Sequence, residues 1–358
     1  MSWQNIQGHD AIVERFVRAS HQNRIAGSYL FVGPDGIGKT TFARTLAKSL
    51  LCQQPQPRLI ACGNCASCVQ AAAGSHPDID IVQKPEDRSS IPIEAFVGDS
   101  NHRMRAGLCW RIKLRPSLGH RKAALILDAD TLLVEAANCL LKTLEEPPDG
   151  SIIILVGTSL ERQLPTIRSR CQIVRFHPLS PNIIFSVLEH EAALRNDSFD
   201  ASSCRNIAHA SNGSLTRARL LLDPDAVSFR NTLVDLLGQS PLNGVALSKE
   251  TLAFVEAAGK DAPARRARLK IVLETALDFF QTVLRLSVAH ASGQDGAFAK
   301  AAAGWASRIS NPTEKASFLL EKSLDALDSV DRNANLSVLI DAWSAVIEAP
   351  QLAKPVNP

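Results

Sequence analysis

The stretch that decides the fold is Gly33-Pro34-Asp35-Gly36-Ile37-Gly38-Lys39-Thr40, a glycine-rich run that ends in Lys and Thr. It follows an apolar run, residues 28–32, and precedes residues 41–51, whose apolar side chains recur with helical spacing. A strand, a glycine loop and a helix in this order are the parts of a phosphate-binding loop. The alternative is an ordinary Gly/Pro turn in front of a helix.

A phosphate-binding loop predicts a nucleotide site. Its glycines let backbone N–H groups turn toward an anion, and the helix N-terminus adds a partial positive charge. The Lys side chain reaches the terminal phosphates, and the Thr hydroxyl holds Mg²⁺. We therefore expect ATP or ADP, with Mg²⁺, at Gly33, Gly36, Gly38, Lys39, Thr40 and Thr41.

Composition limits the possible classes of protein. The chain has 358 residues and 45% hydrophobic content, enough for two or three packed domains. Its longest apolar runs, such as residues 152–156, are too short to span a bilayer, and the N-terminus has no signal-peptide pattern. We expect a cytoplasmic protein without a membrane segment. The net charge of +3 gives no global field for nucleic acid, so any DNA contact must be local.

Four of the eight cysteines, Cys52, Cys62, Cys65 and Cys68, lie close together in the sequence. Such short spacings let four thiolates converge on one Zn²⁺, and a closed four-sulfur shell is typical of a structural site. The alternatives are free thiols in a loop, or a redox pair. The other four cysteines have no such spacing, and we expect them to be small buried hydrophobic residues; they are Cys109, Cys139, Cys171 and Cys204.

The segment after residue 121 predicts the rest of a sheet. Residues 122–127 form an apolar run followed by acids, and residues 134–146 have helical spacing that a Pro pair ends. A further apolar run, residues 151–157, and a shorter one, residues 172–176, follow. Strands that alternate with helices predict a parallel sheet flanked by helices, with ligands at the carboxyl ends of the strands.

These motifs resemble a known family. The glycine loop, the cysteine cluster, the run Leu-Leu-Lys-Thr-Leu-Glu-Glu-Pro-Pro at residues 140–148 and the triplet Ser169-Arg170-Cys171 are similar to those of bacterial clamp-loader subunits. These subunits are AAA+ proteins of the DNA polymerase III holoenzyme. The resemblance covers about the first 225 residues. It is strongest to the delta-prime branch, because of residues 51–56 and the His-Pro-Asp at residues 76–78.

The resemblance implies a hetero-oligomer. Five subunits form an open ring with ATP sites at their junctions, and each site receives an arginine from the adjacent subunit. Arg170 is the candidate for that arginine finger here, although Arg168 and Arg170 also fit an ordinary surface turn. The implied partners are gamma/tau ATPase and delta subunits, with the sliding clamp and primer-template DNA reached through the assembled loader.

This sequence departs from an active ATPase at the acidic strand. Counting back from Asn138, the position of the Mg²⁺-orienting Asp is Leu127, and Asp128 stands where a Glu would polarise water. A misplacement of about 1 Å at such a position costs on the order of a hundredfold in rate. We expect weak or absent hydrolysis, with Asp128 as a degenerate catalytic acid. The alternative is that Asp128 replaces the missing ligand after a shift of register.

Other implied positions are less specific. The residue that senses the terminal phosphate falls at Gly157 or Thr158, of which only Thr158 has a hydroxyl. In a predicted lid helix, Arg217 either contacts a phosphate or is a solvated helix residue. The basic region of residues 103–122 either approaches DNA phosphate or is a solvated face. His102 is expected to be an exposed residue rather than a metal ligand.

The predicted architecture has three parts. An α/β AAA+ P-loop domain, residues 1–177, contains a zinc module at residues 52–68. A small helical lid, residues 178–225, and an all-α collar, residues 226–350, follow, with a tail at 351–358. Loops between helices are predicted at Ser240-Pro241, Gly293–Gly296 and Ser310–Pro312.

The expected role is that of a stator in a clamp loader, with little or no ATP hydrolysis of its own and no polymerase site. Two alternatives stay open. One is a gamma/tau-type motor subunit that hydrolyses ATP in the same loader, and the other is a stand-alone P-loop kinase.

Overall fold

The computed structural model describes residues 3–86, 88–102, 105–195, 200–239, 242–289 and 297–352. The chain divides into two compact units, Met1–Arg219 and Leu220–Pro358. Three predicted features lie outside the described residues: Arg103, the loops at Ser240-Pro241 and Gly293–Gly296, and residues 353–358 of the predicted tail. Among the described residues, none of the helices is both long and apolar enough to cross a membrane.

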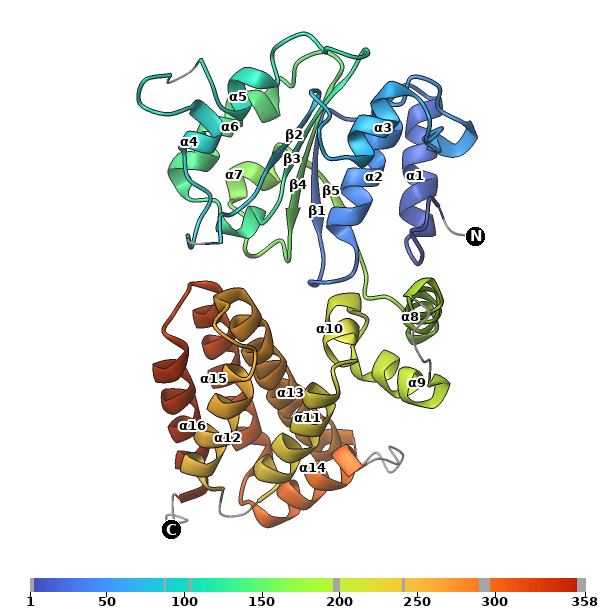
Figure 1. Ribbon diagram of the computed structural model, residues 1–358. Coiled ribbons are helices and arrows are strands. Elements are labelled where there is room, and N and C mark those ends of the chain that lie inside the picture. The colour runs from blue at the N-terminus through green and yellow to red at the C-terminus, as the bar shows by residue number, and fades with distance from the viewer. Residues whose placement is uncertain are drawn as a thin grey trace. The chain divides into compact units, whose positions relative to one another are not determined.

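The first unit is built on a parallel sheet of five strands, and Figure 1 shows its helices on both faces. The strand order is β2-β3-β4-β1-β5, and each pair of neighbouring strands is parallel. The strands are β1 (Ser28–Val32), β2 (Ile79–Val82), β3 (Lys122–Ile126), β4 (Ser151–Gly157) and β5 (Gln172–Arg175). Because they are parallel, their carboxyl ends meet at one edge, where the glycine loop follows β1. The predicted parallel sheet flanked by helices is confirmed.

One face of the sheet packs against α1 (Asp10–His21) and α2 (Lys39–Leu51) around a cluster of aromatic rings. Phe16 of α1 and Phe42 of α2 contact Phe31 of β1, with ring centroids 5.9 to 6.0 Å apart. Phe42 is fully buried and also contacts Phe176, at 5.2 Å. This packing fixes α2, and therefore the glycine loop at its N-terminus, against β1.

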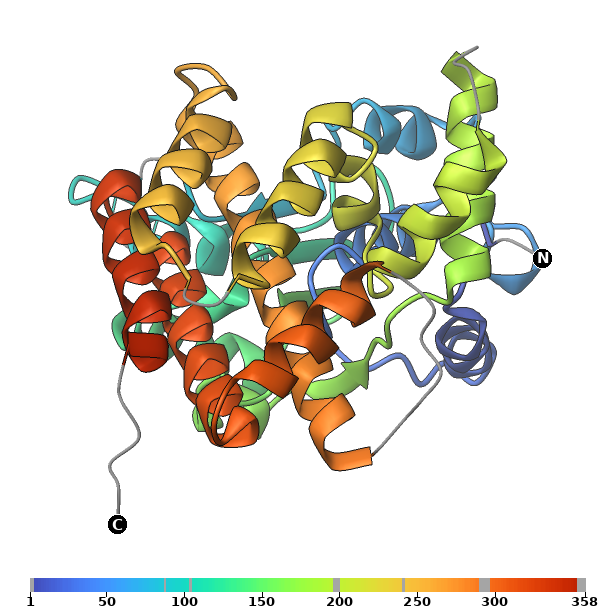
Figure 2. The same cartoon turned by 90° about the horizontal axis from the view of Figure 1, so that it is seen from below.

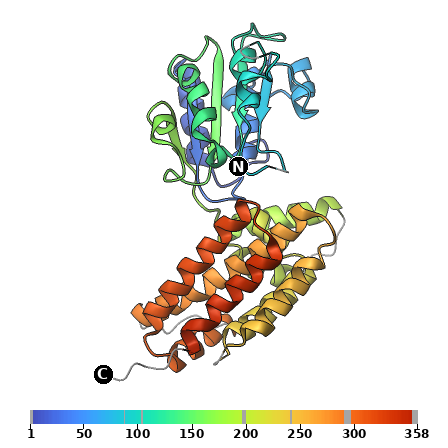
Figure 3. The same ribbon diagram turned by 90° about the vertical axis from the view of Figure 1, so that its left-hand side faces the viewer.

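The opposite face packs against α6 (Val134–Glu145) and three helices of four residues each. The apolar stripe of α6, which includes Leu140 and Leu144, lies on Leu30 of β1 and Ile153 of β4 in one buried core. The short helices are α4 (Glu94–Val97), α5 (Leu108–Arg111) and α7 (Pro165–Arg168). Figure 3 shows these helices beside the sheet after a quarter turn.

The described part of the first unit contains six further helical elements. A 3-10 turn, η1 (Pro57–Leu59), and α3 (Ala66–Ala72) carry the cysteine segment, and η2 (Ala129–Thr131) follows β3. After β5 come α8 (Pro181–Arg195), α9 (Ala201–Ala210) and α10 (Leu215–Leu220). Asp200 caps α9 by accepting the backbone N–H groups of Ser202 and Ser203.

The second unit is helical throughout its described residues, as predicted. Figure 2 looks onto these helices, and their contacts place α13 in the centre, against α11, α14 and α15. The buried Phe279, Phe280 and Trp305 form the middle of its core. The helices are α11 (Pro224–Leu237), α12 (Gly244–Glu256), α13 (Ala262–Ala289), α14 (Ala297–Arg308), α15 (Pro312–Asp331) and α16 (Leu336–Leu352).

Candidate functional site

The glycine loop joins β1 to α2, as the motif requires. Gly36 and Gly38 have φ angles of +76° and +93°, a region that side chains with a Cβ rarely occupy. Gly38 stands at the N-cap of α2, so the first N–H groups of that helix face the loop. The loop therefore has the backbone form of an anion cradle.

Lys39 is buried, with 6% of its surface exposed, and its ammonium contacts the backbone of the glycine loop. Nζ donates to the carbonyl oxygens of Gly33 and Pro34, each at 2.6 Å. Burial lowers the pKa of Lys39, while the nearby carboxylates of Asp35 and Asp130 oppose that shift. The cation is thus held against the backbone of the glycine loop, and its contact with the terminal phosphates of a nucleotide stays a prediction.

Two other segments fasten the outer side of the loop. The backbone N–H of Leu215, at the start of α10, donates to the Gly36 carbonyl at 2.8 Å. His9 Nε2 donates to the Ile37 carbonyl at 2.8 Å, and burial lowers the pKa of His9. Both contacts use carbonyl oxygens of the loop and none of its N–H groups, which are the groups that would bind a phosphate.

The acids after β3 point in different directions. Leu127, at the place of the Mg²⁺-orienting acid, is buried at 6% exposure. Asp128 adopts a left-handed conformation, with φ 56° and ψ 40°, and its Oδ2 accepts the backbone N–H of Lys84 at 3.3 Å. Its assignment as a degenerate catalytic acid stays a prediction.

Asp130 is the acid that the structure ties to the edge of the sheet, and the sequence analysis did not select it. Its two carboxylate oxygens accept the backbone N–H of Thr158 at 2.8 and 3.1 Å, and Gln163 Nε2 also donates to it. Burial raises the pKa of Asp130, although the bonds from Thr158 oppose the shift. The only sequence signal for Asp130 is its place as the second acid after β3.

Thr158 lies at the end of β4, where the predicted sensor was placed. Its carbonyl accepts the backbone N–H of Gly33 at 3.0 Å, which links β4 directly to the glycine loop. Arg217 lies in α10, where its residue is 9% exposed and its backbone N–H donates to Ser214 Oγ at 3.2 Å. The phosphate contacts assigned to the Thr158 and Arg217 side chains stay predictions, as do those of Thr40 and Thr41.

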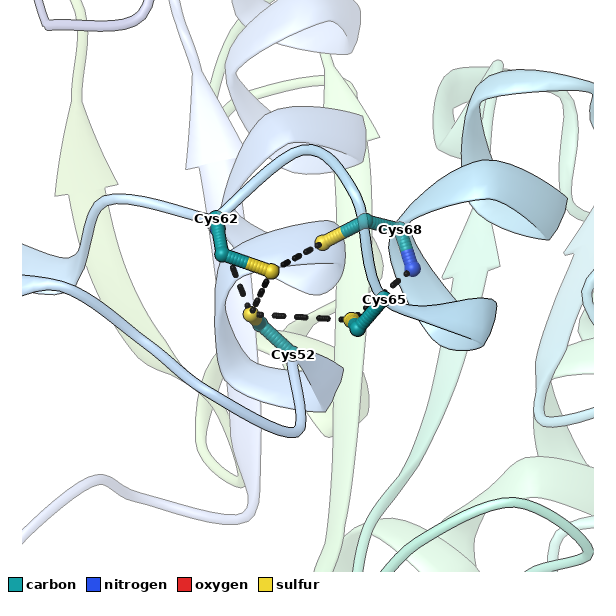
Figure 4. Close-up of side chains that lie close together, drawn as sticks. All are labelled: Cys52, Cys62, Cys65 and Cys68. Carbon is teal, nitrogen blue, oxygen red and sulfur yellow. Dashed lines mark hydrogen bonds between the residues drawn. The ribbon is translucent and has the colours of Figure 1, made fainter.

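The four clustered cysteines converge in space, as Figure 4 shows. Their Sγ atoms all lie within 4.8 Å of one another, with Cys52 to Cys62 at 3.5 Å and both Cys52 to Cys65 and Cys62 to Cys68 at 3.9 Å. Sulfurs bound to one Zn²⁺ at about 2.3 Å form a tetrahedron with edges of about 3.8 Å. The cluster therefore has the donors and the dimensions to hold zinc.

Local structure explains this convergence. Cys52 follows α2 directly, Cys62 lies in the loop after η1, and Cys65 caps α3 by accepting the Cys68 backbone N–H at 3.4 Å. Burial opposes ionisation of Cys65, but backbone N–H groups of Cys68 and Gln53 lower the pKa of its thiol to about 6. A thiol that ionises readily is a good metal ligand.

The His-Pro-Asp segment braces the cysteine cluster. His76 Nδ1 accepts the backbone N–H of Asp78, so Nε2 carries the proton and donates to Ser67 Oγ at 2.9 Å. The Ser67 hydroxyl donates to the Leu51 carbonyl at 2.8 Å, which joins α3 to the end of α2. His76 is thus a supporting residue.

Arg170 lies in the turn between α7 and β5, and it is partly exposed. Its Nε and Nη2 contact Glu145 Oε1, while Nη1 donates to the Thr166 carbonyl at 3.0 Å and to Ser169 Oγ at 3.2 Å. Arg168 points elsewhere and donates to the Leu160 carbonyl at 3.4 Å. Whether Arg170 serves a neighbouring site stays a prediction.

Two basic residues of the region 103–122, Arg111 and Lys122, form bonds within the first unit. Arg111 Nε pairs with Asp80 at 2.5 Å, and the buried Lys122 donates to the Arg111 carbonyl at 2.8 Å. His102 is exposed and pairs with Asp99 at 3.0 Å, so it does not join the cysteine cluster. DNA contact by this region stays a prediction. Of the other four cysteines, Cys109, Cys171 and Cys204 are buried, and Cys139 is partly exposed.

The chain is similar in sequence to subunits of DNA polymerase III. Residues 8–180 match the model described as DNA polymerase III, delta subunit. DNA polymerase III subunit delta' of Pseudomonas aeruginosa is 40% identical over 154 residues, 43% of each chain. Subunit delta' of Bacillus subtilis is 30% identical over 59% of this chain and 60% of its own, and subunit tau of the same organism is 30% identical over 65% and 39%. The chain thus spans less than two thirds of each of these relatives.

The solved structures are more distant. A gamma subunit-related protein of DNA polymerase III from Thermotoga maritima aligns with a TM-score of 0.39 and 16% identity, over 95% of this chain and 99% of its own. The RuvB Holliday junction branch migration motor of the same organism aligns with a TM-score of 0.40 and 15% identity, over 80% and 79%. Residues 8–180, which hold the glycine loop, the cysteine cluster and Arg170, are thus similar in sequence to subunits of DNA polymerase III, and relatives named delta' and tau both match this chain.

Proposed function

We propose that this chain is a delta-prime-like subunit of a bacterial clamp loader. In this role it supplies Arg170 as an arginine finger to the ATP of a neighbouring gamma/tau-type subunit and acts as a stator. Its partners are the ATPase and delta subunits, and through the assembled loader it helps to place the sliding clamp on primed DNA. Residues 178–225 serve as the lid, and residues 226–350 as the collar that holds the ring.

The observation that carries the proposal is the position of Arg170. Its side chain is 29% exposed and lies in a turn that α7 and β5 hold at both ends. A planar cation on a rigid turn can neutralise the charge that develops on a transferred phosphoryl group. The same turn carries the Ser-Arg-Cys triplet on which the family resemblance depends.

The chain's own catalytic groups support a stator rather than a motor. Leu127 replaces a metal ligand, and Asp128 turns toward the backbone of Lys84 instead of toward Lys39. The glycine loop keeps its form, so ATP or ADP with Mg²⁺ can bind at Gly33, Gly36, Gly38, Lys39, Thr40 and Thr41 without being turned over. Zinc held by the four clustered cysteines would support the fold and take no part in chemistry.

The decisive experiment measures ATP turnover by a loader reconstituted from this chain and its own organism's ATPase and delta subunits. Arg170→Ala should lower turnover at the ATP site that it faces by a factor of about 10³ or more, the usual worth of an arginine finger. Arg168→Ala, two residues away at the end of α7, is the matched control and should leave turnover near the wild-type rate. Unchanged turnover in a correctly assembled Arg170→Ala loader would refute the finger role.

The motor-subunit alternative is supported by the intact glycine loop and the similarity to tau. It predicts ATP hydrolysis by the isolated chain that disappears in Lys39→Ala. Our proposal predicts nucleotide binding without such hydrolysis, so a turnover assay on the isolated chain decides between the two. Phosphorylation of a small acceptor by the isolated chain would instead indicate the stand-alone kinase.

A further inference from the structure

We propose that Glu145 is the positioning residue of Arg170: its carboxylate holds the guanidinium in the place from which the finger acts. This inference rests on the finger role proposed above. Glu145 is the last residue of α6 and stands 25 residues before Arg170 in the sequence. The two residues come from different elements, and only the fold brings them together.

The guanidinium is held on all three of its nitrogens. Nε donates to Glu145 Oε1 at 2.6 Å, and Nη2 forms a still shorter contact with the same oxygen. Nη1 donates to the Thr166 carbonyl in α7 and to Ser169 Oγ in the same turn as Arg170. With bonds on opposite sides, the planar group has a fixed direction as well as a fixed place.

The carboxylate comes from a firmly anchored part of the fold. The preceding residue, Leu144, is 2% exposed in the core, and its carbonyl accepts the hydroxyl of the buried Ser28 at the start of β1. Pro147 and Pro148 follow and end the helix, because proline cannot continue it. Glu145 therefore presents its side chain from a rigid helix end, whereas Arg170 extends from a short turn.

This arrangement favours positioning over inhibition. A long arginine side chain loses considerable rotamer freedom when it is fixed, and a carboxylate that fixes it beforehand removes that loss from the docking step. The pair is partly solvated, with 29% of the Arg170 and 49% of the Glu145 side chain exposed. Because water screens the carboxylate, it cancels only part of the positive potential of the guanidinium. The exposed side of Arg170 can therefore still attract a phosphate.

The test compares Glu145→Ala, Glu145→Gln, Arg170→Ala and the double variant Glu145→Ala/Arg170→Ala in the reconstituted loader. Glu145→Ala should lower kcat for ATP by about 10-fold to 100-fold, as expected for a misplaced catalytic group, and leave KM unchanged. Glu145→Gln keeps an acceptor oxygen and should recover part of the rate. Glu146→Ala removes the adjacent exposed carboxylate and should behave like wild type.

The double variant separates positioning from a general structural role. If Glu145 acts only through Arg170, the double variant has the same kcat as Arg170→Ala alone. The inference would be overturned if Glu145→Ala lowered kcat by the same factor in the Arg170→Ala background as in the wild type. A normal or raised kcat in both Glu145 variants would also overturn it. If Arg170→Ala itself has no effect, the finger role and this inference fall together. Should Glu145→Ala not assemble, the isosteric Glu145→Gln decides, because positioning still requires its kcat to fall.

Discussion

The Asp130 carboxylate accepts the backbone N–H of Thr158, and the Thr158 carbonyl accepts the N–H of Gly33 at 3.0 Å. These bonds connect the acids after β3, the end of β4 and the first glycine of the loop. The three segments meet because the carboxyl ends of parallel strands share one edge of the sheet. Asp130 is therefore linked through Thr158 to the glycine loop even though it stands apart from the predicted catalytic position.

Replacing Asp130 should distinguish its charge from its bonds. Asp130→Ala leaves the Thr158 N–H and the Gln163 amide without their acceptor and should lower the free energy of unfolding by about 1 to 3 kcal/mol. Asp130→Asn keeps an acceptor oxygen and removes a buried charge, so it should cost much less. Urea unfolding at pH 7 makes the comparison, and equal losses in the two variants would contradict it.

The Asp130 carboxyl should also produce a pH dependence. Burial raises its pKa above the ordinary 3.8, so the folded state prefers the protonated acid. The stability of the wild type relative to Asp130→Asn should therefore be greatest below pH 3.8, decrease as the pH rises through the raised native pKa, and then level off. A difference in unfolding free energy that stays constant across this range would show that the carboxyl is not perturbed.

Gly36 and Gly38 offer a matched pair in the glycine loop. Both have positive φ, so an alanine at either position costs about 1 to 2 kcal/mol of backbone strain. A Cβ at Gly36 would also stand 2.1 Å from Ser214 Oγ, whereas one at Gly38 meets no atom within 4 Å. Gly36→Ala should therefore lower the melting temperature of the nucleotide-free protein more than Gly38→Ala. Equal melting temperatures would show that the contact with Ser214 contributes nothing.

Much of the first unit could be predicted because its signals are local. The apolar run of residues 28–32 coincides with β1, and residues 151–157 coincide with β4. The edge strand β2 was not predicted, since its four residues include the polar Asp80 and lack a continuous apolar pattern. A short strand at an edge depends on its partner, here β3, more than on its own sequence.

In the candidate site, too, the local features could be predicted and the long-range contacts could not. The glycine loop and the cysteine cluster could be recognised because each lies within a short stretch of chain. The bond between Asp130 and Thr158 spans 28 residues, and that between Arg170 and Glu145 spans 25. Both separations are too long for the partners to meet within one helix or strand. The packing of α6 brings Glu145 to Arg170, and the register of β3 on β4 brings Asp130 to Thr158.

The cysteine cluster should behave as a structural zinc site. The purified protein should contain about one zinc ion per chain by elemental analysis, and Cys68→Ser should lower both the zinc content and the melting temperature. Cys139→Ser is the control, since Cys139 lies in α6, away from the cluster, and its thiol donates to the Glu135 carbonyl of the same helix. A zinc content that is the same in Cys68→Ser and in the wild type would exclude this site.

In the second unit, Arg268 of α13 should be a stabilising residue of the helical bundle. It donates to the Phe254 carbonyl at 3.0 Å and to Asp223 at 3.1 Å, and its guanidinium lies 4.8 Å from the Phe254 ring. It thereby joins α13 to α12 and to the N-cap of α11, with 15% of its side chain exposed. The paired Asp223 is 40% exposed, so most of the effect should come from the carbonyl bond and the ring contact.

Arg268→Ala should therefore lower the free energy of unfolding of this unit by about 1 to 3 kcal/mol, and Arg268→Lys should recover only part of the loss. An ammonium lacks the planar group that bonds to the carbonyl and packs on the ring at once. Lys249→Ala, which removes an exposed cation from α12, should change the stability by less than about 0.5 kcal/mol. Urea unfolding followed by tryptophan fluorescence measures all three variants. If Arg268→Ala is no less stable than Lys249→Ala, the three helices must be held together by their apolar contacts alone, and the bonds of Arg268 only replace those it would make to water.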